Sequence, residues 1–237
     1  MESVGHRPDG KWEFDSSVAS CFDDMLQRSI PDYIGMRDLV FRIGSRFVKD
    51  NTAIVDLGCS RGDALVPFIR DFGCYNKHVG VECSDAMLEV CRERFSGLID
   101  SGVVSIQDLD LRHEFPRVSA SLILSVLTLQ FIPIEYRQHV LRNCYESLVS
   151  GGALILVEKV LGSNALIDEL LVDEYLKMKR RNGYSEEDVL RKKLSLEGVL
   201  VPLPMEENMK MLGMEGFRSV DVFWRNMNFC GILAVKD

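Results

Sequence analysis

Short apolar runs alternate with amphipathic segments through the middle of the chain. The apolar runs have the length and content of buried strands, and the segments between them repeat their apolar residues at helical spacing. Strands are expected at 52–59, 77–83, 103–110, 119–131 (leaving its sheet near Val126) and 152–160. Helices are expected between them at 63–72, 85–99 and 133–148. This order predicts a mostly parallel sheet covered by helices on both faces.

The flanking regions follow other patterns. Residues 1–11 are polar and are expected to form a disordered tail, and helical periodicity begins at Trp12 and stops at Pro31. A second helix is expected from Asp32 or Tyr33 to Val48. Residues 163–198 predict a charged helical insert, and 216–226 and 228–237 predict two antiparallel strands. We therefore expect one α/β domain, 12–237, with an N-terminal helical cap (12–48) and a helical insert (163–198).

Charge narrows the range of partners. The formal net charge is −8, and an acidic surface repels phosphate backbones, so no direct nucleic-acid partner is expected. The basic run Lys177, Lys179, Arg180 and Arg181 is either a local basic patch or a solvated helix end.

Cysteine usage and hydropathy bear on the compartment. The seven cysteines are scattered and form no Cys-x-x-Cys pair, which argues against a disulfide framework and a structural metal site. The N-terminus lacks an apolar signal core, and no apolar run reaches the roughly 20 residues of a membrane helix. A cytoplasmic protein without a membrane partner is expected.

The strongest chemical signal is the segment 55–62, VDLGCSRG. A buried strand ends in Asp56, and the turn after it contains Gly58 and Gly62. Glycine lets the backbone approach a ligand closely, and the helix that follows presents free N–H groups to the turn. Glu82 lies 20 residues after Gly62, at the end of the next strand, where an acid typically binds a ribose diol. Asp110 ends the third strand, so all three acids are expected at the carboxyl edge of the sheet.

The turn is not the dinucleotide pattern Gly-x-Gly-x-x-Gly, although NAD remains a competing ligand. VDLGCSRG resembles the S-adenosylmethionine (SAM) motif of class I methyltransferases, which implies a Rossmann-like fold with SAM, or a carboxylated derivative of it, as cofactor. Ser125 and Val126, at the end of the fourth strand, are added to the expected cofactor site.

Longer segments resemble carboxy-S-adenosylmethionine synthases, bacterial enzymes whose product is used in tRNA wobble-uridine modification. The matching segments are WEFDSSVASCFDDMLQRSIPDY, VDLGCSRG, LTLQF, SGGALILVEK, KRRNGYSE and FWRNMNFCGILAVK, in order over almost the whole chain. The resemblance implies that Tyr33 closes over the ligand and that Gly58, Cys59 and Ser60 form the SAM turn. It also implies that Glu82 and Cys83 lie at the ribose and adenine, and that Asp110 and Leu111 lie beside the adenine.

Two positions depart from that family. Val126 stands where the family has asparagine, and Lys193 stands where the family has an arginine that grips a carboxylate, unless a shift of two residues places Arg191 there. Arginine binds a carboxylate through a planar fork, whereas lysine is a point charge.

The motifs and the resemblance leave three hypotheses for the function. The first hypothesis is a SAM-dependent methyltransferase acting on a small molecule, since methyl transfer needs positioning more than a dedicated acid or base. The second is a carboxy-SAM synthase, in which family resemblance implies prephenate as carboxyl donor and a sulfonium ylide of SAM. The third is a non-catalytic SAM-binding or partner-binding module, against which the intact acid-and-glycine set argues.

No catalytic residue or metal ligand is assigned. The expected polar wall of the substrate site is Tyr33, Glu158, Lys193, Arg225 and Asn226. The resemblance implies a homodimer. The insert carries an apolar stripe (Leu166, Leu170, Leu171, Tyr175 and Met178) that either forms the dimer interface or packs on its own domain.

Overall fold

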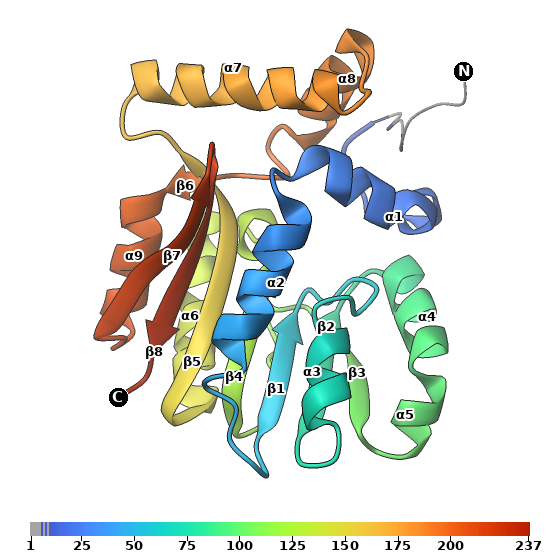
Figure 1. Ribbon diagram of the computed structural model, residues 1–237, viewed down its shortest axis with the longest axis vertical. Coiled ribbons are helices and arrows are strands. Elements are labelled where there is room, and N and C mark those ends of the chain that lie inside the picture. Colours follow the sequence, from blue (N-terminus) through green and yellow to red (C-terminus); the bar gives the residue numbers. More distant parts are fainter. Residues whose placement is uncertain (1–5, 7, 9) are drawn as a thin grey trace.

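The computed structural model describes His6, Pro8 and residues 10–237. The expected disordered tail therefore falls largely outside the described residues. The central sheet has the order β3-β2-β1-β4-β5-β8-β7. Its parallel strands are β1 (Ala53–Leu57), β2 (Lys77–Glu82), β3 (Val104–Asp108), β4 (Ala120–Val126) and β5 (Leu148–Leu161). Antiparallel β7 (Ser219–Asn226) and β8 (Phe229–Val235) extend it, as expected, and β6 (Leu203–Pro204) pairs with the end of β5 (Figure 1).

Two helical layers cover the sheet because its strands are apolar on both faces. On β1, Ile54 packs beneath α2 (Tyr33–Gly44) and α3 (Val66–Phe72). Its neighbours Val55 and Leu57 point the other way, toward α6 (Ile134–Ser147) and α9 (Met205–Met214). Helices α4 (Asp85–Arg94) and α5 (Ser96–Asp100) pack beside β3. The arrangement confirms the Rossmann-like, mostly parallel α/β fold.

The cap and the insert lie at the carboxyl ends of the parallel strands. Figure 1 shows α7 (Ala165–Arg181) and α8 (Glu186–Leu196) beyond the end of the sheet toward which β1 points, with α1 (Ser16–Ser29) beside them. Local caps fix these helices. The Asp15 carboxylate accepts the N–H of Val18 at 2.9 Å, and Ser185 and Asp188 form a capping box at the start of α8.

Several expected boundaries were wrong. The first helix begins at Ser16 rather than Trp12, because Asp15 caps it and the Trp12 N–H bonds instead to the Ser195 carbonyl. Strand β5 begins at Leu148, so residues 148–151 continue the sheet instead of ending a helix. Helix α9 was not predicted, although its signal was present in Pro204 followed by two acids in the first turn. No helix among the described residues is long and apolar enough to span a membrane.

Candidate functional site

The turn after β1 has three residues in the left-handed backbone region. They are Gly58 (φ +66°), Ser60 (φ +48°) and Gly62 (φ +78°). Two backbone hydrogen bonds hold the turn: the Cys59 N–H donates to the Val81 carbonyl at 2.9 Å, and the Gly62 N–H donates to the Cys59 carbonyl at 2.7 Å. The turn is therefore fixed both to itself and to β2.

Both glycines are also sterically required. A Cβ at Gly58 would lie 2.5 Å from the Thr128 side chain, whose hydroxyl donates to the Leu57 carbonyl at 2.8 Å. A Cβ at Gly62 would lie 2.3 Å from the Phe95 ring. The sequence suggests that these glycines let the backbone approach a ligand, and in the structure protein side chains already exclude a Cβ at both positions.

The Glu82 carboxylate joins the ends of β1 and β2. One of its oxygens accepts the N–H of Ser60 at 2.9 Å, and the other accepts the N–H groups of Cys83 (2.9 Å) and Ser84 (3.0 Å). Ser84 in turn caps α4. The acid expected at a ribose is therefore held beside the glycine turn by backbone donors that fix its position.

Asp56 is the buried acid of the site. It is 2% exposed, and burial raises its pKa to about 7, while nearby Arg37 lowers the pKa and Glu82 and Asp63 raise it. Arg37 lies 5.8 Å over the Tyr33 ring and donates to its hydroxyl at 3.3 Å. A cation near Asp56 would stabilise its charged form. Arg37 thus contacts Tyr33 directly and acts on Asp56 through its charge.

Sequence reasoning missed two members of this group. Arg37 lies one helical turn after Tyr33, so their shared face of α2 was a usable signal. Asp63 follows the glycine turn and forms an ion pair with Arg94 at 2.5 Å, while its other oxygen is buried without a hydrogen bond. Nothing in the sequence separated Asp63 from an ordinary residue at the start of a helix.

The acid after β3 is organised by a local pair. Both carboxylate oxygens of Asp110 accept hydrogen bonds from the Arg112 guanidinium, and this pairing holds the pKa of Asp110 below its usual range. Leu111 is buried in the core beneath α6, and Cys83 is exposed. Although the residue as a whole is exposed, partial burial of its sulfur, together with the nearby Glu82 and Asp110 carboxylates, raises the pKa of the Cys83 thiol, so it is protonated near neutral pH.

The remaining expected cofactor residues lie at neighbouring strand ends. Ser125 is buried and Val126 half-buried at the end of β4, before Leu127 in the left-handed region (φ +62°). Cys59 is buried, and its hydrogen bond with Cys91, together with burial, raises the pKa of its thiol. Neither Cys59 nor Cys83 has the lowered pKa of a reactive cysteine.

The five residues expected to line the substrate site are spread over several elements. Glu158 is 3% exposed, and its carboxylate accepts the N–H groups of Leu129 (3.0 Å) and Gln130 (2.7 Å) at the start of the 3₁₀ helix η1 (Leu129–Phe131). Tyr33 is buried, Lys193 and Arg225 are exposed, and Asn226 is half-buried at the end of β7.

Strand register and packing bring some of these elements together. Asn226 pairs with Phe229, which pairs with Lys159 of β5. Tyr33 of the cap, Tyr175 of the insert and Phe229 belong to one apolar cluster. The cap, the insert and the C-terminal strands therefore meet at one end of the sheet.

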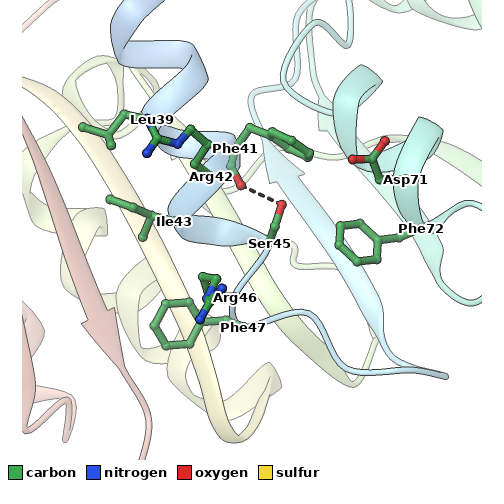
Figure 2. A pocket seen from close by; sticks show the side chains of 9 residues that line it. All are labelled: Leu39, Phe41, Arg42, Ile43, Ser45, Arg46, Phe47, Asp71 and Phe72. Atoms are coloured by element: carbon green, nitrogen blue, oxygen red, sulfur yellow. Dashed lines mark hydrogen bonds between the residues drawn. The ribbon is translucent and has the colours of Figure 1, made fainter.

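A separate groove of about 630 Å³ lies on the outside of α2 and α3. Phe41, Phe47 and Phe72 line it together with Arg42 and Arg46 (Figure 2). It contains none of the acids or glycines described above, and Figure 2 shows its residues around the C-terminal part of α2.

Comparison with known proteins gives the family. A methyltransferase-domain family model matches residues 54–152. A carboxy-S-adenosyl-L-methionine synthase from Methylococcus capsulatus is 41% identical over 224 residues, covering 94% of this chain and 93% of that protein. One from Erwinia tasmaniensis is 35% identical, covering 96% of this chain and 92% of that protein.

Solved structures agree on the fold. An O-methyltransferase family protein from Burkholderia thailandensis has a TM-score of 0.69 at 15% identity, covering 94% of this chain and 60% of that one. A putative SAM-dependent methyltransferase from Methanococcus maripaludis has a TM-score of 0.63 at 18% identity, covering 98% and 97%. The chain therefore belongs to the carboxy-S-adenosyl-L-methionine synthase family and is a SAM-dependent transferase with the class I methyltransferase fold.

Proposed function

We propose that this protein is a carboxy-SAM synthase that transfers a carboxyl group from prephenate to SAM. The observation that supports this most is the extent of the similarity. The general methyltransferase domain accounts for residues 54–152 alone, whereas the synthases match 94% of the chain. The similarity therefore includes the cap, the insert and the C-terminal strands, which surround the carboxyl edge of the sheet. Of the two enzymatic activities that the sequence suggests, the family names favour carboxyl transfer over methyl transfer.

In this proposal the residues at the sheet edge hold SAM. Glu82 binds the ribose hydroxyls, and Asp110 and Leu111 flank the adenine. The Gly58–Gly62 turn passes along the methionine part, and the buried Asp56 carboxylate balances the positive charge of SAM. Tyr33, held by Arg37 at 3.3 Å, closes over the ligand from α2. Ser125 and Val126 complete the floor at the end of β4.

Lys193 receives the transferred carboxylate in this proposal. It lies on the exposed side of α8. Burial lowers the pKa of Lys159, Asp168 raises it, and the charge of Lys193 lowers it further, so Lys193 acts electrostatically on Lys159. Lysine binds a carboxylate as a point charge, so replacement by the family's arginine strengthens binding of the product.

The test is mass spectrometry of the small molecule released when the purified protein is denatured. Carboxy-SAM is expected from the native protein and from Lys193→Arg, and a reduced amount from Lys193→Met. Lys177→Met is the matched control, because Lys177 is an exposed lysine of α7 paired with Asp173 and Glu174. SAM or S-adenosylhomocysteine alone in every sample would overturn the proposal.

The second candidate is a small-molecule methyltransferase on the same scaffold. Val126 and Lys193, which replace the family's asparagine and arginine, favour it, because methyl transfer needs neither side chain. Conversion of SAM to S-adenosylhomocysteine with an added acceptor, without carboxy-SAM from prephenate, would identify this activity.

We also propose a cytoplasmic homodimer that pairs through the insert. Five large apolar side chains of α7 and α8 are exposed, namely Leu166 (74%), Ile167 (36%), Leu170 (59%), Leu190 (55%) and Leu194 (55%). Exposed apolar surface of this kind favours association. Tyr175 of the expected stripe packs instead in the core. Light scattering after gel filtration should give the dimer mass, and a monomer for Leu166→Glu/Leu170→Glu; a monomeric native protein would contradict the proposal.

A further inference from the structure

Three lysines from separate elements converge beneath the insert, and we refer to them as the lysine cluster. Lys159 is near the end of β5, Lys179 is in the last turn of α7, and Lys192 is in α8. Lys179 is 4% exposed and Lys192 is 7% exposed, although lysine is among the residues least often buried. Of the two alternatives for the basic run, a solvated helix end does not describe Lys179, whose side chain is buried.

Aromatic rings contact all three ammonium groups. The Tyr175 ring centroid lies 5.0 Å from Lys159 Nζ and 5.7 Å from Lys179 Nζ. The Tyr184 ring centroid lies 4.9 Å from Lys179 Nζ and 5.8 Å from Lys192 Nζ, and the Trp12 ring lies 4.9 Å from Lys192 Nζ. Cation–π contacts account for part of this placement.

The surroundings fix these rings. The Tyr184 N–H donates to the Lys179 carbonyl at 3.2 Å, and the Tyr184 and Ser29 hydroxyls are 3.1 Å apart. The backbone N–H of Trp12 donates a hydrogen bond to the Ser195 carbonyl at 2.9 Å and holds this residue over the cluster. The cluster is thus enclosed by α1, α7, α8 and the segment before α1.

No carboxylate of the described residues forms an ion pair with any of the three lysines. The Lys192 ammonium donates a long hydrogen bond to the Ser29 hydroxyl at 3.4 Å. Burial lowers the pKa of Lys179 to about 8 and that of Lys192 to about 7, and each lysine lowers the pKa of the next. Burial also lowers the pKa of Lys159, while the Asp168 carboxylate raises it. Lys179 and Lys192 have no ion-pair partner among the described residues, and burying like charges in this way is unfavourable. An arrangement of this kind is stabilised by an anion that binds among the ammonium groups.

We propose that the lysine cluster is a binding site for a small organic dicarboxylate. The alternation of ammonium and ring contacts favours two carboxylates joined by a hydrocarbon portion over a compact anion such as phosphate, because each tyrosine ring that contacts two ammonium groups also offers an apolar surface to the ligand. The carboxylates pair with the lysines, and the hydrocarbon portion packs against Tyr175 and Tyr184. That this dicarboxylate is the carboxyl donor rests on the proposed function, whereas the anion site itself does not.

The test measures binding without turnover. In a Trp224→Phe background Trp12 is the single tryptophan, so its fluorescence reports on the cluster. Titration with malonate, succinate and prephenate is compared with inorganic phosphate and with sodium chloride at matched ionic strength, and calorimetry repeats each titration on the unmodified protein. We expect saturable binding of at least one dicarboxylate, tighter than that of phosphate, and a higher Tm in its presence.

Variants locate the site. Lys179→Met and Lys192→Met should each weaken dicarboxylate binding at least tenfold while keeping or raising the Tm of the ligand-free protein, because each removes an uncompensated buried charge. Lys177→Met, an exposed lysine on the same helix, should bind as the native protein does.

Absence of saturable dicarboxylate binding to unmodified protein that still binds SAM would overturn the proposal, as would equal binding of phosphate or unchanged affinity in both cluster variants. Saturable dicarboxylate binding by a protein that makes no carboxy-SAM would support the site and overturn the proposed function. Carboxy-SAM synthesis with an unchanged donor KM in both variants would overturn only the assignment of the carboxyl donor to this site.

Discussion

Replacement of Gly58 by alanine tests the central turn most sharply. Gly58 has φ +66°, and an added Cβ would lie 2.5 Å from two atoms of the Thr128 side chain. A left-handed backbone conformation costs an alanine roughly 1–2 kcal/mol. Moving Thr128 away also breaks its 2.8 Å bond to the Leu57 carbonyl, which costs about 1 kcal/mol more. The free energy of unfolding should therefore fall by about 2–3 kcal/mol.

Gly102→Ala is the matched control for backbone strain. Gly102 has φ +75°, close to that of Gly58, but no atom lies within 4 Å of its added Cβ. It is in the exposed turn before β3, away from the carboxyl edge of the sheet. This variant should lose roughly 1–2 kcal/mol from strain alone and bind SAM as the native protein does.

The assay combines urea unfolding with calorimetric titration of SAM. Gly58→Ala should lower the SAM affinity at least tenfold, because the displaced turn no longer presents its backbone along the ligand. Equal losses of stability in the two variants would refute the steric argument. Native SAM affinity in Gly58→Ala would refute the placement of the ligand at this turn.

Four further predictions concern charged side chains. Because burial raises the pKa of Asp56 to about 7, SAM affinity should rise as pH increases through about 7 and then level off, and Asp56→Asn should flatten this profile in calorimetry. The pKa of Asp56 is about 7 in the folded protein and about 4 in the unfolded chain, so its contribution to stability is largest below pH 4 and is lost as the pH rises through 7. Asp56→Asn should therefore be more stable than the native protein at pH 8. No gain in stability would contradict the raised pKa. Glu82→Gln should weaken SAM binding about tenfold and lower the free energy of unfolding by about 1–3 kcal/mol, because both carboxylate oxygens accept backbone N–H groups and the amide NH2 cannot; unchanged affinity would argue against ribose binding there. Arg137→Leu should lower the free energy of unfolding by about 2–5 kcal/mol in urea, because the buried Arg137 guanidinium donates to the carbonyls of Ile132, Gln130 and Val201 and leucine leaves them without this donor; a loss below 1 kcal/mol would contradict this.

The sequence predicts the β1 turn because its information is local. The glycines of residues 58–62 and the acids that end β1, β2 and β3 occur at fixed distances along the chain, and the parallel sheet then places them at one edge. The boundaries of α1 and β5 were less predictable, because caps and strand pairing decide them and apolar periodicity does not.

Residues brought together from distant segments could not be predicted. Lys179 has the same local sequence character as its exposed neighbours, and only the packing of Tyr175 and Tyr184 shows that it turns inward. Likewise, Glu158 is expected in the polar wall of the substrate site, and the structure shows its carboxylate held by two backbone N–H groups of η1.

The central claim is carboxyl transfer, and isotope transfer tests it most directly. Purified protein is incubated with SAM and uniformly ¹³C-labelled prephenate, and the nucleoside products are analysed by mass spectrometry. The account predicts carboxy-SAM that carries one ¹³C atom from prephenate. Recovery of unchanged SAM, or of S-adenosylhomocysteine, without any carboxy-SAM would contradict the account if the protein binds SAM.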